Sequence, residues 1–172
     1  MSGDIELGWL RAPLSIQRGV LDAIHAHALR DYPGECCGFV YGPRAAPALL
    51  SRAVAETNEA DKYHARDPDT FPRTSKEYFK INGLRASRAF DESVTSEEPL
   101  KVVYHSHCDC GAYFSKEDQL VAAPDGEPVL PVVYLVTSVR GGGVVDDHKL
   151  FVFKDGEWVE GPFLVADRPS MM

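Results

Sequence analysis

The first part of the chain changes from a helical to an extended pattern of apolar residues. Within residues 13–35, apolar side chains recur at helical spacing at Ile16, Val20, Ile24 and Ala28. This spacing predicts a helix, with Ser15 as its N-cap and Pro33–Gly34 at its end. The run CCGFVYG at residues 36–42 is short, apolar and closed by glycine, so we expect a strand that begins directly after Glu35.

The middle of the chain mixes strand, loop and helix signals. ALLSRAVAET, residues 48–57, favours a second strand. The polar stretch Asn58–Arg73 contains two prolines and is typical of a long loop with a functional role. Thr74 and Glu77 then have capping-box spacing in front of apolar residues at helical intervals, which predicts a second helix over residues 74–90.

The second half of the chain is dominated by extended patterns. LKVVYHSH at residues 100–107 and VLPVVYLVTSV at 129–139 predict strands, and FSKEDQLVAA at 114–123 predicts a short helix between them. The runs at 149–156 and 157–166 meet at an Asp-Gly pair, which is typical of a hairpin. The sum is a mixed α/β or α+β fold with about six strands and three helices.

Composition and charge narrow the class of protein. With 44% hydrophobic and 26% charged residues, the 172-residue chain has the composition of a globular protein. We expect a single domain over residues 1–172, with its core at about 14–140 and further strands at 147–165. The formal net charge of −8 disfavours a nucleic-acid binder, because phosphate contacts require clustered Lys and Arg.

Three further features concern location and redox state. No apolar run reaches the roughly 20 residues of a membrane helix. The start, MSGDIELGWLRAPLS, lacks the basic and apolar regions of a signal peptide. We therefore expect a cytoplasmic protein that does not bind membranes. Its four cysteines form an adjacent pair and a C-x-C, which differs from a secreted disulfide framework and predicts reduced thiols.

Residues 102–119 concentrate the side chains that carry chemistry. Successive side chains of a strand point to opposite faces, so His105 and His107 share one face and can share one metal ion. Catalytic zinc sites commonly combine two histidines, one carboxylate and a water. Asp118 is the best candidate for the carboxylate, because it lies in the first turn of the helix predicted to start at Ser115.

Other readings of the same residues stay open on spacing alone. Asp109, Glu117 and the thiols of Cys108 and Cys110 compete with Asp118 for the third ligand position. The S-x-x-D spacing from Ser115 is also a capping box, which begins ordinary helices for local hydrogen-bonding reasons. The conjunction of this spacing with two histidines on one face favours a metal site.

The segment HSHCDCGAYFSKED, residues 105–118, resembles the signature of the JAMM metallopeptidases, also called MPN-plus or JAB domains, in their prokaryotic form. That signature is an upstream glutamate, then H-x-H, seven residues and S-x-x-D. PGECCGFVYG resembles the glutamate segment, with Glu35 in place. The resemblance extends from Ile16 to the region of Val139 and implies the family fold, a mixed sheet flanked by helices.

The resemblance also implies a role for each matching residue. His105, His107 and Asp118 would bind Zn²⁺, Glu35 would contact the water and act as general base, and Ser115 would help to hold the oxyanion. Two neutral histidines and one carboxylate leave such a site at about +1, which suits a water with a pKa near ~7.

The implied reaction is hydrolysis of a peptide or isopeptide bond after the C-terminal Gly-Gly of a ubiquitin-like protein. This reaction would release a conjugated partner or process a sulfur-carrier precursor, and an E1-like enzyme would belong to the same pathway. An extended tail of this kind binds as an added strand or in a narrow channel, and we expect Asn58–Arg73 to form part of its binding site.

One departure and two rival functions remain. Cys108 stands where many family members have proline; we expect it to line a loop, while the alternative is a thiol that competes for zinc or makes the site redox-sensitive.

A non-catalytic MPN-type scaffold or ubiquitin-like-protein-binding module is the first rival function, although such proteins lack the metal residues. A zinc deaminase is the second, but it requires H-x-E with C-x-x-C, whereas this chain has H-x-H with C-x-C.

Overall fold

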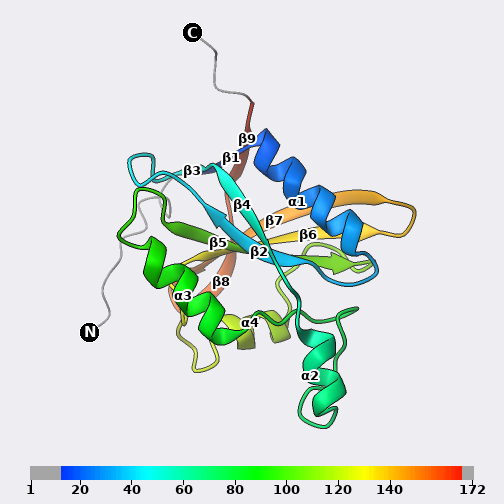
Figure 1. Ribbon diagram of the computed structural model, residues 1–172. Coiled ribbons are helices and arrows are strands. Elements are labelled where there is room, and N and C mark those ends of the chain that lie inside the picture. The colour runs from blue at the N-terminus through cyan, green and yellow to red at the C-terminus, as the bar shows by residue number, and fades with distance from the viewer. Residues whose placement is uncertain (1–12, 168–172) are drawn as a thin grey trace.

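The structure, a computed structural model, describes residues 13–167 (Figure 1). The start of the chain on which the signal-peptide expectation rests lies mostly outside the described residues. Within the described part, none of the helices is long and apolar enough to cross a membrane.

A six-stranded mixed sheet forms the centre of the fold, in the order β4-β2-β5-β6-β7-β8. Its strands are β2 (Cys37–Tyr41), β4 (Arg52–Glu56), β5 (Leu100–Cys108), β6 (Val133–Arg140), β7 (Val144–Lys154) and β8 (Glu157–Gly161). β5 and β6 run parallel, and the other neighbours pair antiparallel. β2, β5 and β6 are buried along almost their whole length, which agrees with their continuous apolar runs.

Helices cover both faces of this sheet (Figure 1). Helix α1 (Arg18–Asp31) packs its apolar side on one face, and α3 (Gly83–Ser93) and α4 (Lys116–Ala122) lie on the other. A separate core cluster fills each interface. The side chains of β5 alternate between the two clusters, so Tyr104 faces α1 while His105 faces the side of α3 and α4.

A second, three-stranded sheet lies beside the first. Its order is β3-β1-β9, with β1 (Leu14–Gln17) parallel to both β3 (Leu49–Leu50) and β9 (Phe163–Ala166). The predicted Asp-Gly hairpin forms between β7 and β8, with positive φ at Asp155 and Gly156. The chain then leaves the hairpin at Pro162 and joins the second sheet as β9, which the sequence pattern does not predict.

Three sequence predictions about local structure are wrong. Ser15 lies in β1, and α1 begins after Gln17 without a side-chain cap. The predicted loop Asn58–Arg73 contains helix α2 (Ala60–Arg66). The predicted helix over 74–90 starts only at Gly83, because the side chain of Asn82 accepts from the amides of two following residues and caps it there.

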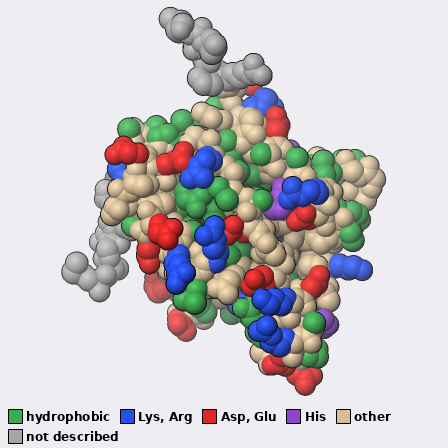
Figure 2. Space-filling view, viewed as in Figure 1, with side chains coloured by type: hydrophobic (Ala, Val, Ile, Leu, Met, Phe, Trp, Pro, Cys, Tyr) green, Lys and Arg blue, Asp and Glu red, His purple; other side chains and the backbone are tan. Residues whose placement is uncertain are grey.

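The mixed α/β fold class is confirmed, with nine strands and four helices in the described part of the chain. On the face shown in Figure 2, Lys and Arg side chains are interspersed with Asp and Glu.

Candidate metal centre

Strand β5 supplies two histidines to the face of the sheet opposite α1. His105 and His107 are 0% and 3% exposed, and their Nε2 atoms lie 3.3 Å apart. The ring of Phe79 stacks on His105 with centroids 4.3 Å apart, and Tyr113 packs edge-on against His107 at 4.7 Å. The two imidazoles therefore meet in an aromatic, water-poor environment.

The first turn of α4 brings a carboxylate to the same point. Asp118 Oδ2 lies 3.1 Å from Nε2 of His105 and 3.1 Å from Nε2 of His107. The same oxygen accepts from the amide of Ser115 at 3.0 Å, while Ser115 Oγ accepts from the amide of Asp118 at 3.0 Å. One carboxylate thus closes the capping box and also lies within 3.1 Å of both imidazoles.

The distances between the two Nε2 atoms and Asp118 Oδ2 match the distances between ligand atoms around one zinc ion. Atoms bound tetrahedrally at 2.0–2.1 Å lie about 3.3–3.4 Å from one another, close to the 3.1–3.3 Å found here. Burial alone would raise the pKa of Asp118, but the charges and hydrogen bonds of the two histidines outweigh it and lower that pKa well below its usual range. The spacing of the donor set therefore fits Zn²⁺, and the low pKa keeps the Asp118 carboxylate ionised.

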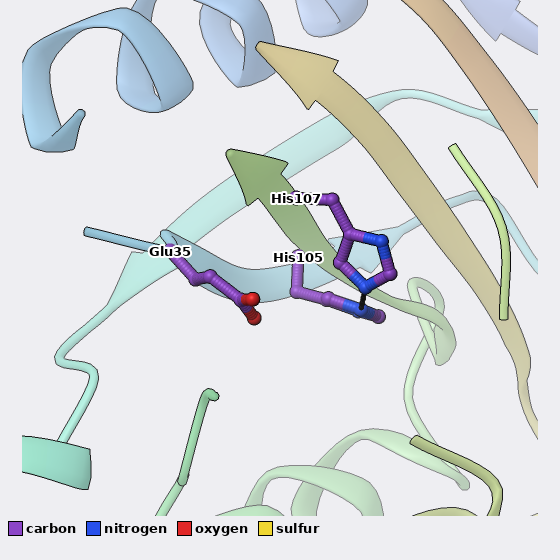
Figure 3. A group of neighbouring side chains, drawn as sticks. All are labelled: Glu35, His105 and His107. Carbon is purple, nitrogen blue, oxygen red and sulfur yellow. Dashed lines mark hydrogen bonds between the residues drawn. The ribbon is translucent and has the colours of Figure 1, made fainter. Parts of the chain in front are cut away.

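Glu35 lies beside this group, on the segment that enters β2. Its carboxylate is within 4.8 Å of the ligand nitrogens of both histidines and points toward His105 (Figure 3). Glu35 is 5% exposed, and burial, together with the charges of Asp118 and Glu77, raises its pKa to about 9. A metal ion could combine the two histidines with either carboxylate, but the shorter distances and the low pKa favour Asp118 as ligand and Glu35 as its neighbour.

Ser106, between the two histidines, attaches the Glu35 segment to β5. Its Oγ accepts from the amide of Cys36 at 2.7 Å, and its own amide donates to the Cys36 carbonyl at 3.0 Å. Both side chains are completely buried on the α1 side of the sheet. The segment that carries Glu35 is therefore held in fixed register with the two histidines.

The rings of the histidines are held differently. His107 Nδ1 lies 3.1 Å from the carbonyl oxygen of Gly111. Since a carbonyl only accepts, Nδ1 carries a proton, which would leave the lone pair of Nε2 for an ion once a metal replaces the hydrogen bond from Nε2 to Asp118. Among the described residues, the buried Nδ1 of His105 has no hydrogen-bond partner, so stacking on Phe79 is what restrains that ring.

Three of the four competitors for the third ligand position make contacts of their own. Asp109 accepts from Tyr32 and Gly141, and Glu117 pairs with Arg73 at 2.7 Å. Cys108 packs against the core cluster on the α1 side, the opposite face from His107.

The thiols near the centre are protonated in the absence of a cation. Burial raises the pKa of Cys108 to about 12 and also raises that of Cys110. Without a cation both side chains are therefore thiols at neutral pH, and a cation bound next to either of them would lower its pKa again.

One residue that the sequence analysis missed organises the surroundings of Glu35. Asn58 Nδ2 donates to the carbonyls of Glu35 and Tyr78, both at 2.9 Å. Its Oδ1 accepts from the amides of Ala60 and Lys80 at 2.9 and 3.0 Å. No sequence signal could have identified it, because an asparagine in a polar stretch is usually exposed.

Comparison with known proteins identifies relatives over most of the chain. The family described as prokaryotic homologs of the JAB domain matches residues 17–150. The CysO-cysteine peptidases of Mycobacterium tuberculosis and Mycobacterium bovis are each 28% identical over 118 residues, which cover 68% of this chain and 71% of theirs.

Solved structures share the fold. A protein from Desulfitobacterium hafniense, solved in solution, gives a TM-score of 0.64 at 19% identity and covers 91% of this chain and 95% of its own. A JAB1/MPN domain protein from Archaeoglobus fulgidus gives a TM-score of 0.51 at 15% identity, with 89% and 99% covered.

Proposed function

The chain belongs to the prokaryotic homologues of the JAB domain, and from this premise we propose that it is a zinc-dependent peptidase of the JAMM kind. Its substrate would be a ubiquitin-like protein, cut after a C-terminal Gly-Gly. The observation that carries the proposal is the convergence of three buried ligand atoms of His105, His107 and Asp118 at 3.1–3.3 Å, with the Glu35 carboxylate beside them.

His105, His107 and Asp118 would hold the metal. Bound Zn²⁺ supplies a Lewis acid that lowers the pKa of a water molecule and polarises the carbonyl of the scissile bond. The burial of all three ligands keeps bulk water away, which strengthens each electrostatic interaction at the centre.

Glu35 is suited to move the proton. Burial raises its pKa to about 9 in the absence of a cation, so a proton placed on this carboxylate is held near neutral pH. A neighbouring divalent cation favours the ionised form. Glu35 can therefore accept a proton from the attacking water and then deliver it to the leaving amine.

Ser115 is suited to stabilise negative charge. Its Oγ accepts from the amide of Asp118, which fixes the side chain and leaves its O–H group as a donor. The side chain is held at the first turn of α4, next to Asp118. A donor fixed in this way needs no reorganisation when charge develops on the substrate carbonyl.

A groove lined in part by helix α4 could hold an extended tail. It has a volume of about 470 Å³ and lies between the segment after α2 and helix α4, where Glu117, which precedes Asp118 in the sequence, lines it. Its lining residues are Thr70, Phe71, Pro72, Arg73, Tyr78, Lys80, Glu117, Leu120, Val121 and Pro124. The apolar side chains suit the backbone and small residues of a Gly-Gly tail, and the relatives' name favours a sulfur-carrier protein as its owner.

The proposal is tested by zinc content and cleavage in parallel. Elemental analysis of the wild type, His107→Ala and Glu35→Gln would accompany incubation with a ubiquitin-like protein extended beyond its Gly-Gly. We expect about one zinc in the wild type and in Glu35→Gln, less in His107→Ala, and cleavage by the wild type alone. Unchanged zinc in His107→Ala would contradict the ligand assignment, and zinc bound as expected without any cleavage would contradict the substrate.

A further inference from the structure

A carboxylate outside the metal centre joins the two segments that carry it. Asp109 Oδ2 accepts from the hydroxyl of Tyr32 at 2.5 Å, and Asp109 Oδ1 accepts from the amide of Gly141 at 2.8 Å. Tyr32 comes three residues before Glu35, and Asp109 comes two residues after His107. One side chain therefore connects the start of the Glu35 segment to the end of the strand that carries the histidines.

The backbone at Asp109 turns the chain toward His107. Its φ is +61°, a left-handed conformation that aspartate and asparagine tolerate better than most residues. Its amide donates to the carbonyl of Val139 at 2.8 Å, where β5 separates from β6. Two residues later the carbonyl of Gly111 accepts from His107 Nδ1. The turn at Asp109 thus determines where the partner of the His107 ring lies.

Asp109 is exposed, but Gly141, whose amide it accepts from, lies close against Tyr32. A Cβ at Gly141 would lie 3.0 Å from the Tyr32 hydroxyl and 3.9 Å from Asp109 Oδ1. The far end of the Glu35 segment is fixed as well, since the amide of Glu35 donates to the carbonyl of Ser75 at 2.6 Å. A displacement of Tyr32 would therefore be passed to Glu35 along a short path that is anchored at both ends.

We propose that Asp109 is a positioning residue that sets the placement of Glu35 relative to His107. This inference rests on the proposed function, in which Glu35 exchanges a proton next to the ion that His107 holds. Tyr32 transmits the effect of Asp109 to the Glu35 segment, and the turn before Gly111 transmits it to the histidine ring. The two branches can be separated by substitution.

Tyr32→Phe removes only the branch to Glu35. We expect kcat to fall about tenfold with KM unchanged, which is the usual size of an effect from an outer residue of a metal site. Zinc release to a chelator should keep the wild-type rate, and amide hydrogen exchange over residues 34–37 should become faster. Tyr41→Phe, which removes a hydroxyl at the distant end of β2, is the matched control and should change none of these quantities.

Asp109→Ala removes both branches. Here we expect the same loss of kcat and, in addition, about tenfold faster zinc release. Asp109→Asn keeps the left-handed backbone and one acceptor oxygen, so it should recover part of both losses.

The Tyr32→Phe variant also gives the result that would contradict the positioning role. A Tyr32→Phe protein with wild-type exchange over residues 34–37 and kcat within twofold of the wild type would overturn the inference. Exchange and zinc release need no substrate, so a failure of the proposed cleavage would be seen separately from a failure of the positioning role.

Discussion

Ser115 and Asp118 serve both the cap of α4 and the candidate metal centre, and two substitutions separate these functions. Ser115→Ala removes one of the two reciprocal cap bonds, each 3.0 Å long, and should lower the unfolding free energy by about 1 kcal/mol with or without zinc. Asp118→Asn retains an oxygen that can accept from the Ser115 amide but removes the charge that a zinc ligand set needs. It should therefore abolish the stabilisation by zinc.

The expected size of the zinc effect follows from mass action. Free zinc at about 1,000 times its dissociation constant stabilises the folded state by about 4 kcal/mol. For a domain of this size, 1 kcal/mol corresponds to roughly 2–4 °C in Tm, so zinc should raise the wild-type Tm by about 8–16 °C. Ser115→Ala should keep that rise while both of its transitions shift down by about 2–4 °C.

The assay is thermal unfolding of chelator-treated protein, with and without added zinc. Glu117→Gln is the matched control, because it changes the charge next to Asp118 in the sequence but breaks only the half-buried pair with Arg73. A full zinc-induced rise in Asp118→Asn would refute the assignment of Asp118 as a ligand. Loss of the rise in Ser115→Ala would refute the separation of cap and ligand.

Three more substitutions test the fold and its pH response. Lys101→Met removes the ammonium of a buried lysine that lies 2.9–3.1 Å from four backbone carbonyl oxygens of the segment between β2 and β4 and has three N–H groups to donate to them. Urea unfolding should show a loss of about 2–5 kcal/mol, against less than about 1 kcal/mol for Lys149→Met at an exposed position, and equal losses would contradict this. Phe79→Ala should cost about 3–5 kcal/mol in the metal-free protein, because it opens a cavity against His105, and a cost below 1 would show that the site collapses. Burial lowers the pKa of His148, so the unfolded chain binds that proton first as the pH falls below about 6.5. Stability should fall there, His148→Gln should flatten the slope, and an unchanged slope in this variant would contradict the assignment to His148.

The parts of the fold that the sequence predicts well are those specified by local signals. β5 and α4 appear where the apolar pattern and the capping box place them, and the Asp-Gly hairpin forms between β7 and β8. The alternation of β5 alone is enough to bring His105 and His107 to one face. The family resemblance is confirmed by the match over residues 17–150.

The parts that it misses are decided by contacts between distant segments. Residues 74–82 have a capping-box pattern, yet Phe79 is buried against His105, and Asn58 accepts from the Lys80 amide. These contacts hold the segment in an irregular conformation, and the helix starts only where Asn82 can cap it. Likewise, β9 pairs with β1 from the opposite end of the chain, which no local pattern reveals.

The most direct test of the central claim is zinc X-ray absorption of the loaded wild-type protein. The account predicts a first shell of nitrogen and oxygen atoms only, at about 2.0–2.2 Å, with the outer-shell scattering of two imidazoles. A sulfur atom at about 2.3 Å would contradict it, because a thiol of Cys108 or Cys110 would then have displaced one of the three ligands proposed on β5 and α4.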